Sequence, residues 1–160
     1  MAGSVFDSQI LNELFPTGEI GELFTDAAEI RAMMRVEGNL AKIQGQKGII
    51  PEMSAKAIHR AAMKLQLDPS KLTKATGQNG VSVPGLIALF QKHLQAPEHA
   101  QYVHFGPTSQ DIMDTGLMLR LSEMLSLQEH VLKTLLEQLA ELSKKHAELP
   151  MVARTYGQDA

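Results

Sequence analysis

The chain has 160 residues, of which 44% are hydrophobic and 21% are charged, and its formal net charge is −3. This length is enough for one domain, or for one domain and a piece of the next. The composition is ordinary for a soluble globular protein, and the slightly acidic charge excludes the basic surface that indicates a nucleic-acid partner. Because the sequence contains no cysteine, disulfides, thiolate metal sites and cysteine nucleophiles are excluded as well.

Neither a membrane span nor a secretory signal is expected. No run of residues approaches the roughly 18 apolar residues that a transmembrane helix needs. Residues 1–7 lack a basic segment followed by an apolar core. We therefore expect a cytoplasmic protein that contacts no membrane.

The first half of the chain predicts two helices. Residues 1–24 are expected to be irregular, because proline and glycine interrupt them. Thr25 is a typical N-cap residue, and it predicts a helix that begins at Asp26. This helix ends where residues 48–51, Gly-Ile-Ile-Pro, break its apolar pattern, and the stripe within residues 58–65 predicts a second helix.

The middle of the chain is predicted to alternate short helices and loops. Asp68-Pro69 opens a turn or a brief helix, and residues 77–80, Gly-Gln-Asn-Gly, predict a loop. Ser82 is a candidate cap for a helix that has Pro84 in its first turn and ends near His93.

The strongest periodicity lies between Ile112 and Leu149, where apolar residues recur at spacings of three, four or seven. They are Leu117, Leu121, Met124, Val131, Leu135, Leu139 and Leu142. This pattern predicts a helix of about 50 Å that packs lengthwise against other helices, which favours a bundle and partner subunits. No segment alternates with a period of two, so the predicted fold class is all-α.

The stretch at residues 104–111, His-Phe-Gly-Pro-Thr-Ser-Gln-Asp, directly precedes the long helix. The N–H groups of a first helical turn have no intrahelical partner, and the helix dipole places partial positive charge there. The hydroxyls of Thr108 and Ser109 add hydrogen-bond donors. These features predict a site for a small molecule that bears a carboxylate; the alternative interpretation of Thr108-Ser109 is a plain helix cap.

The pattern HxGxTSQDxxDT at residues 104–115 resembles the first conserved loop of the fumarase/aspartase superfamily. Adenylosuccinate lyases and carboxymuconate cycloisomerases use this form of the loop. Residues 37–51 are similar to the superfamily's first long helix and its exit, and residues 119–149 to the first helix of its central bundle. Residues 154–160, RTYGQDA, resemble the second conserved loop.

Two positions favour the cycloisomerase branch. Val83-Pro84 stands where adenylosuccinate lyases usually carry a His-Asp pair. Tyr156 stands where the lyases have the histidine of their second loop. Two alternatives remain open: a lyase that releases fumarate, similar to adenylosuccinate lyase, or a helical assembly module without catalysis.

The resemblance implies an architecture and a chemistry. It implies an N-terminal helical domain at residues 1–111 and, at residues 112–160, the truncated start of a central helix-bundle domain. A cycloisomerase closes a lactone from 3-carboxy-cis,cis-muconate through an aci-carboxylate intermediate, in the β-ketoadipate route of aromatic-acid breakdown. No cofactor and no metal are implied, and the substrate is a small di- or tricarboxylate.

The resemblance also implies a homotetramer in which each active site takes loops from three subunits. The superfamily's third loop, which carries the serine usually taken as the base, has no match in this sequence, so we expect the chain alone to be inactive. His104 and Ser109 are the candidate catalytic residues, and His104 orients a loop or contacts the substrate. The residues expected to bind substrate are Thr108, Ser109, Gln110, Arg154, Thr155 and Gln158.

The other polar residues that stand out in the sequence are expected to have structural rather than catalytic roles. Asp111 and Asp114 are expected to be first-turn charges that interact favourably with the helix dipole. Tyr156 is expected to be a pocket wall rather than an acid, because an unperturbed tyrosine has a pKa of about 10. The remaining histidines show no metal-ligand spacing and are expected at the surface: His59, His93, His99, His130 and His146.

Overall fold

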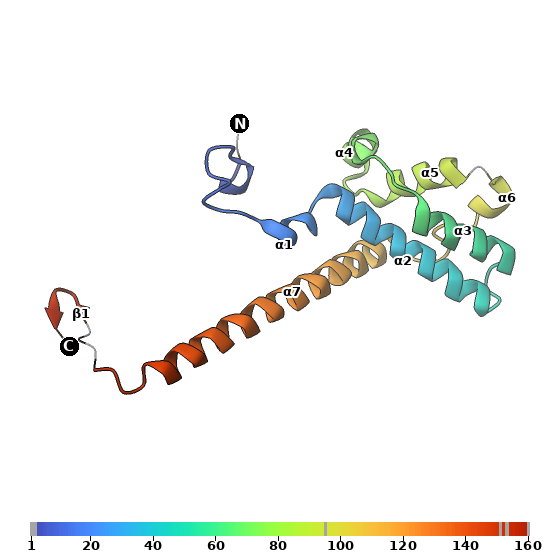
Figure 1. The fold of residues 1–160 in the computed structure, drawn as a ribbon. Coiled ribbons are helices and arrows are strands. Elements are labelled where there is room, and N and C mark those ends of the chain that lie inside the picture. Colours follow the sequence, from blue (N-terminus) through green and yellow to red (C-terminus); the bar gives the residue numbers. More distant parts are fainter. Residues whose placement is uncertain (1–2, 95, 151, 153, 160) are drawn as a thin grey trace. The chain divides into compact units, whose positions relative to one another are not determined.

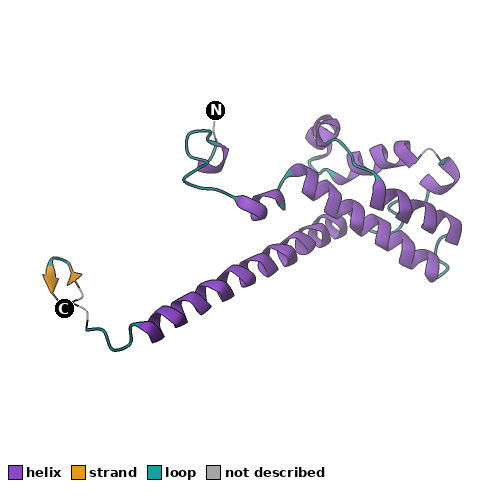
Figure 2. Cartoon of the chain, viewed as in Figure 1, coloured by secondary structure: helices purple, strands orange, loops and turns teal. Residues whose placement is uncertain are grey.

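The computed structural model describes residues 3–94, 96–150, 152 and 154–159, and for residues 154, 155, 158 and 159 it describes the backbone alone. Nearly all of the regular structure in these residues is helical (Figure 2), which confirms the predicted all-α class. The chain forms two compact units, residues 1–124 and 125–160. The predicted domain boundary at residues 111 and 112 stays a prediction about the larger protein.

Figure 1 follows the elements along the chain. Residues 1–24, predicted to be irregular, contain two short helices, η1 (Val5–Asp7) and α1 (Gly18–Glu22). The remaining elements of this part are α2 (Asp26–Gln46), α3 (Glu52–Lys64), η2 (Pro69–Leu72), α4 (Thr73–Asn79), α5 (Val83–Leu94) and α6 (Pro97–Ala100). The helix α7 (Ser109–Lys145) contributes to both units, and the two-residue strands β1 (Arg154–Thr155) and β2 (Gln158–Asp159) follow it.

The helix α2 begins as predicted at Asp26. The Thr25 hydroxyl accepts a hydrogen bond from the Ala28 backbone N–H at 3.2 Å, which satisfies one of the unpaired donors of the first turn. The helix buries Ile30, Met33 and other apolar side chains in the core of residues 1–124. Burial of these side chains in a shared core is what stabilises a helix of this length.

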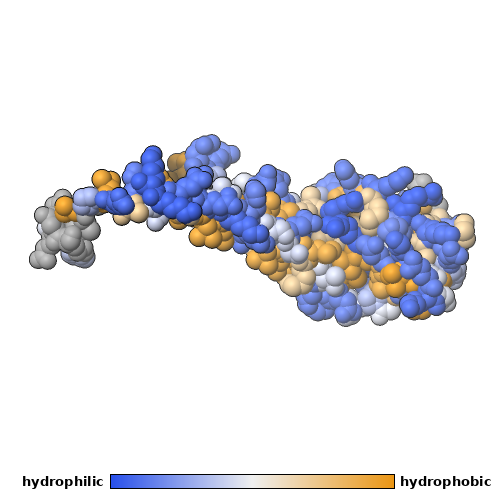
Figure 3. Space-filling view, turned by 60° about the horizontal axis from the view of Figure 1, so that its bottom comes forward, coloured by the Kyte–Doolittle hydropathy of each residue, from blue (hydrophilic) through white to orange (hydrophobic). Residues whose placement is uncertain are grey.

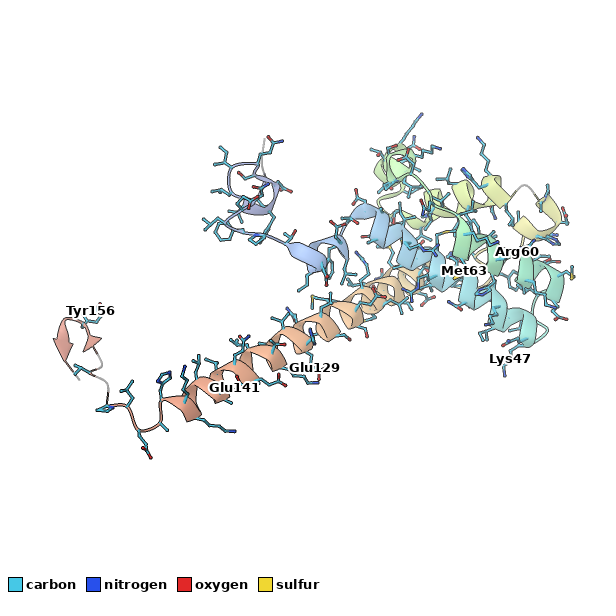
Figure 4. The ribbon with its side chains drawn as sticks, viewed as in Figure 1. Lys47, Arg60, Met63, Glu129, Glu141 and Tyr156 are labelled. Carbon is cyan, nitrogen blue, oxygen red and sulfur yellow. The ribbon has the colours of Figure 1, made fainter. Side chains whose placement is uncertain are left out.

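Small residues bring α2 and α3 close together. A Cβ atom added at Gly38 would lie 2.8 Å from Cβ of Ala62 and 2.9 Å from Cε of Met63, the residue labelled in Figure 4. The guanidinium of Arg31 donates hydrogen bonds to the carbonyls of Ala62 at 3.1 Å and Met63 at 2.6 Å. These carbonyls belong to the last turn of α3 and have no partner within the helix, so Arg31 closes that end of α3.

The prediction of a loop at residues 77–80 is wrong in part. Residues 73–79 form α4, and only Gly80, with φ of 74°, leaves the helical conformation as its C-cap. The glycine at position 77 misled the prediction, because glycine weakens a helix without forbidding it. Gly80 ends α4 in the left-handed conformation that glycine adopts at low cost.

Contacts of Gly116 and Arg120 hold the first turns of α7 against α2 and Phe24. Gly116 lies against Met33, where an added Cβ would be 3.3 Å from Cγ. The Arg120 guanidinium is 3.4 Å from the Glu29 carboxylate and lies over the Phe24 ring, 5.5 Å from its centroid. The contact at Gly116 therefore fixes where α7 starts, and with it the position of residues 104–108.

The part of α7 in residues 125–145 carries an apolar stripe that is exposed in this chain. The large apolar residues of the stripe are Leu125, Val131, Leu132, Leu135, Leu136, Leu139 and Leu142. Figure 3 shows this stripe as hydrophobic patches along the helix. On its polar side Glu129, labelled in Figure 4, forms an ion pair with Lys133 at 2.6 Å.

The glycines of α2 and α4 give a matched test of helix packing. We predict that Gly45→Ala lowers the free energy of unfolding by about 1–3 kcal/mol, because the added Cβ would collide with Cβ of Ala55. Gly77→Ala, where no atom lies within 4 Å of the added Cβ, is expected to raise it by about 0.5–1 kcal/mol. Urea unfolding followed by circular dichroism measures both changes, and a stabilising Gly45→Ala would contradict the packing described here.

Candidate functional site

The candidate site is the segment from His104 to Asp111, which leads into α7. The helix starts at Ser109, and its first turn is closed by Asp111. The Asp111 carboxylate accepts a hydrogen bond from the Thr108 backbone N–H at 2.9 Å, and the Asp111 N–H donates to the Thr108 carbonyl at 3.1 Å. Asp111 is therefore the first-turn charge that the sequence predicts, and it supplies half of a capping box.

The hydroxyls of this segment are left available. Among the residues that the structure describes, neither the Thr108 nor the Ser109 hydroxyl has a hydrogen-bond partner. Thr108 is exposed and Ser109 is half-buried. Neither hydroxyl therefore acts as a cap in the described residues, and the plain-cap interpretation stays an untested alternative.

The predicted binding residue Gln110 has a local partner. Its side-chain amide donates a hydrogen bond to the Asp114 carboxylate at 2.5 Å, one helical turn further along α7. Gln110 is exposed, and its amide has a second N–H and a carbonyl oxygen that this hydrogen bond does not use. Its role in binding stays a prediction.

His104 contacts a buried carboxylate that lies 67 residues earlier in the chain. Its Nδ1 atom is 2.6 Å from Oε1 of Glu37, on α2. The Glu37 side chain is 1% exposed, while the His104 side chain is 22% exposed. His104 also adopts φ of 60°, a left-handed conformation that costs a residue with a Cβ about 1–2 kcal/mol. The contact with Glu37 offsets part of this strain.

A second side chain of α2 fixes the same segment. The Gln44 amide donates a hydrogen bond to the Phe105 carbonyl at 2.6 Å, and Gln44 is itself buried. The next residue, Gly106, has φ of 94°, which favours glycine. Residues 104–106 therefore take a backbone path that α2 holds at two consecutive positions.

Burial raises the pKa of the Glu37 carboxyl above 4.5, because the charged form loses its hydration. Hydrogen bonds from His104 and its positive charge act in the opposite direction, and burial is the larger effect. An acidic group with a raised pKa and a specific charged partner is a recognised indication of a functional site.

Two histidines correct the prediction that the remaining histidines are surface residues. His59 is half-buried and its Nδ1 lies 3.1 Å from the Gly38 carbonyl. His99 is half-buried too, with Nδ1 3.0 Å from the Ser54 hydroxyl. Both rings join helices to one another, which spacing along the sequence does not indicate. The remaining three, His93, His130 and His146, are exposed as predicted.

The second predicted loop forms the paired strands β1 and β2, in which Arg154 pairs with Asp159 and Thr155 with Gln158. The side chains of Arg154, Thr155 and Gln158 lie outside the described residues, so their binding roles stay predictions. Tyr156, at the turn between the strands, has φ of 49° and is fully exposed in this chain. It is labelled in Figure 4.

Sequence reasoning missed Glu37 and Gln44. Both are buried polar residues on the face of α2 that also carries Met33, Met34 and Ala41. The available signal was a carboxylate and an amide within this apolar stripe, since charged residues are almost never fully buried without a partner. Their partners, His104 and Phe105, are too distant in sequence for spacing to reveal them.

Among the described side chains, no group of three or more histidine, aspartate or glutamate residues could hold a metal ion. Within the same part of the chain, no helix has the length and apolar character needed to cross a membrane.

Comparison with known proteins defines the class. A family model described as a lyase matches residues 15–160, and the chain therefore belongs to this lyase family. It is 35% identical to 3-carboxy-cis,cis-muconate cycloisomerase of Pseudomonas putida over 96% of this chain and 37% of that protein. It is 32% identical to N-acetyl-S-(2-succino)cysteine lyase of Enterococcus italicus, over 100% of this chain and 35% of that protein.

A solved structure agrees with these sequence matches. The crystal structure of 3-carboxy-cis,cis-muconate lactonizing enzyme from Pseudomonas putida superposes with a TM-score of 0.88 at 34% identity, covering 96% of this chain and 35% of that one. These matches confirm the predicted resemblance to the fumarase/aspartase superfamily. The chain spans about a third of the length of these relatives.

The buried carboxylate predicts a pH dependence of stability. A raised pKa means that folded Glu37 binds a proton more tightly than unfolded Glu37, so its contribution to stability falls as the pH rises from about 4.5 through the raised value. The unfolding free energy of the natural chain relative to Glu37→Gln should therefore decrease over this range. Urea unfolding of both proteins at several pH values measures it, and an increase with pH would contradict the raised pKa.

Proposed function

We propose that the complete protein carrying this chain is a cycloisomerase that converts 3-carboxy-cis,cis-muconate to a carboxymuconolactone. The observation that carries the proposal is the pair of unpartnered hydroxyls at the start of α7, on a chain that is similar to cycloisomerases from three bacteria. In the reaction a substrate carboxylate oxygen forms a bond to an alkene carbon. The alkene electrons move onto an adjacent carboxylate, and a proton added at carbon completes the lactone.

The chemistry needs hydrogen-bond donors where negative charge collects. The aci-carboxylate intermediate carries extra charge on its oxygens, and preorganised donors stabilise such charge. The helix dipole at Ser109 favours an anion, but the Asp111 carboxylate already occupies part of that field. We therefore assign binding of the substrate carboxylate chiefly to the Thr108 and Ser109 hydroxyls.

The remaining parts of the site follow from the family. Arg154 is suited to a carboxylate because its guanidinium can donate two parallel hydrogen bonds, and Thr155 and Gln158 would contribute from the same segment. A homotetramer built on the exposed stripe of α7 would bring loops of several subunits together. In this proposal the chain alone is inactive, and the complete enzyme acts in the breakdown of aromatic acids.

A fumarate-releasing lyase is the second candidate. The relative from Enterococcus italicus is a lyase by name and matches the chain at 32% identity. Adenylosuccinate lyase of Methanocaldococcus jannaschii matches at 29% identity. Lactone formation by a cycloisomerase and fumarate release by a lyase would both use a carboxylate-binding loop of this kind. The loop alone therefore does not distinguish the two candidate functions.

Direct assay of the complete protein separates the two candidates. We predict that ultraviolet absorbance of 3-carboxy-cis,cis-muconate changes on addition of enzyme, as its conjugated double bonds are lost on lactone formation. Adenylosuccinate and argininosuccinate should release no fumarate. Release of fumarate from either substrate, with no absorbance change for the muconate, would favour the lyase.

Removal of the Ser109 hydroxyl tests the site itself. We predict that Ser109→Ala in the complete enzyme lowers kcat/KM by about 100-fold, the usual effect of losing one donor to a developing anion. The matched control is Ser70→Ala, an exposed serine of η2 whose loss should leave kcat/KM unchanged. Equal kcat/KM for Ser109→Ala and the natural enzyme would mean that the loop has no part in catalysis.

A further inference from the structure

The pair formed by Glu37 and His104 is more than the loop needs for its shape. Gln44 already fixes residues 104–106 through the Phe105 carbonyl, at 2.6 Å, and it does so with an uncharged amide. A carboxylate that is 1% exposed carries a desolvation cost, and well-packed apolar side chains in place of both members of a buried pair are often as stable or more stable. The presence of a buried acid at position 37 therefore points to a role beyond packing.

The geometry determines which ring atom of His104 is available. Nδ1 is occupied, because it lies 2.6 Å from Oε1 of Glu37. No group among the described residues binds Nε2, and the His104 side chain keeps 22% of its surface exposed. Any exchange of a hydrogen bond or proton between the ring and a ligand must therefore go through Nε2.

We propose that Glu37 is a positioning residue, which holds the His104 ring by Nδ1 and thereby presents Nε2–H to a carboxylate of the substrate. This inference rests on the proposed function and adds a residue of α2 to its binding site. The charges balance without a co-reactant. With Glu37 ionised and the ring protonated on both nitrogens, the pair is formally neutral and Nε2 donates to the substrate anion. If Nε2 releases its proton, the pair becomes an anion, and the remaining proton stays on Nδ1 against Glu37.

Asparagine and glutamine variants of His104 distinguish the roles of the two ring nitrogens, because each variant keeps a polar atom at only one of the two positions. The amide of His104→Asn reaches the position of Nδ1 and keeps a donor for Glu37, but it has nothing at the position of Nε2. The amide of His104→Gln reaches the position of Nε2 and loses the contact with Glu37. The matched control is His99→Asn, since His99 is also half-buried and also hydrogen-bonded through Nδ1.

The readout is the dissociation constant of propane-1,2,3-tricarboxylate for the complete enzyme, measured by calorimetry, so that it does not depend on turnover. We expect His104→Asn to weaken binding about tenfold with little change in the thermal midpoint, the cost of losing a hydrogen bond to a charged group. His104→Gln should lower the thermal midpoint and weaken binding as well, because its donor is no longer held. His99→Asn should leave binding unchanged.

Replacement of the acid tests Glu37 directly. Glu37→Leu should weaken binding of the same probe about tenfold and lower the thermal midpoint, because it removes one partner of a buried pair. If Glu37→Leu does not fold, His104→Asn decides alone. Unchanged binding in His104→Asn, unchanged binding in a folded Glu37→Leu, or no binding of the probe by the natural enzyme would each overturn the proposal.

Nitrogen-15 NMR of the 160-residue chain gives an independent readout. With the tricarboxylate bound, we expect Nε2 of His104 to carry a proton, and a ring whose Nε2 is bare would overturn the proposal. A wrong assignment of the cycloisomerase function would give a different outcome from the binding and NMR results that overturn this proposal. In that case the tricarboxylate still binds and Nε2 is still protonated, while 3-carboxy-cis,cis-muconate is not turned over.

Discussion

The buried contact between Glu37 and His104 is the interaction on which the candidate site depends. It joins the middle of α2 to the segment before α7, at 2.6 Å, across 67 residues of sequence. A carboxylate in the core is stable only when a partner satisfies it, and His104 satisfies it while adopting a left-handed backbone conformation. Each residue therefore accounts for the unusual state of the other.

The helix α2 organises everything around this contact. On one side its glycines admit α3 at close range, and the side chain of Arg31 caps the end of that helix. Met33 receives Gly116 and so fixes where the first turns of α7 lie. Glu37 and Gln44 then hold residues 104 and 105. The result is a rigid framework beneath a loop whose hydroxyls have no partner in the described chain, as a binding site requires.

Local signals in the sequence were sufficient for the longer helices α2, α3, α5 and α7 and for the motif. The cap at Thr25, the apolar period of the long helix and the pattern at residues 104–115 each depend on neighbouring residues. What could not be predicted depends on partners far apart in sequence or on weak local preferences. Glu37 looks like an ordinary helix residue until α2 folds against residues 104–106. The helix α4 forms despite its glycine, because glycine weakens a helix without forbidding it. The roles of the second loop stay predictions, because the side chains of Arg154, Thr155 and Gln158 lie outside the described residues.

The most direct test of the account is a crystal structure of the complete protein with a bound tricarboxylate. The account predicts one carboxylate within hydrogen-bond distance of the Thr108 or Ser109 hydroxyl, with the His104 ring still paired to Glu37. A ligand bound away from both hydroxyls, with water alone at the start of α7, would contradict it.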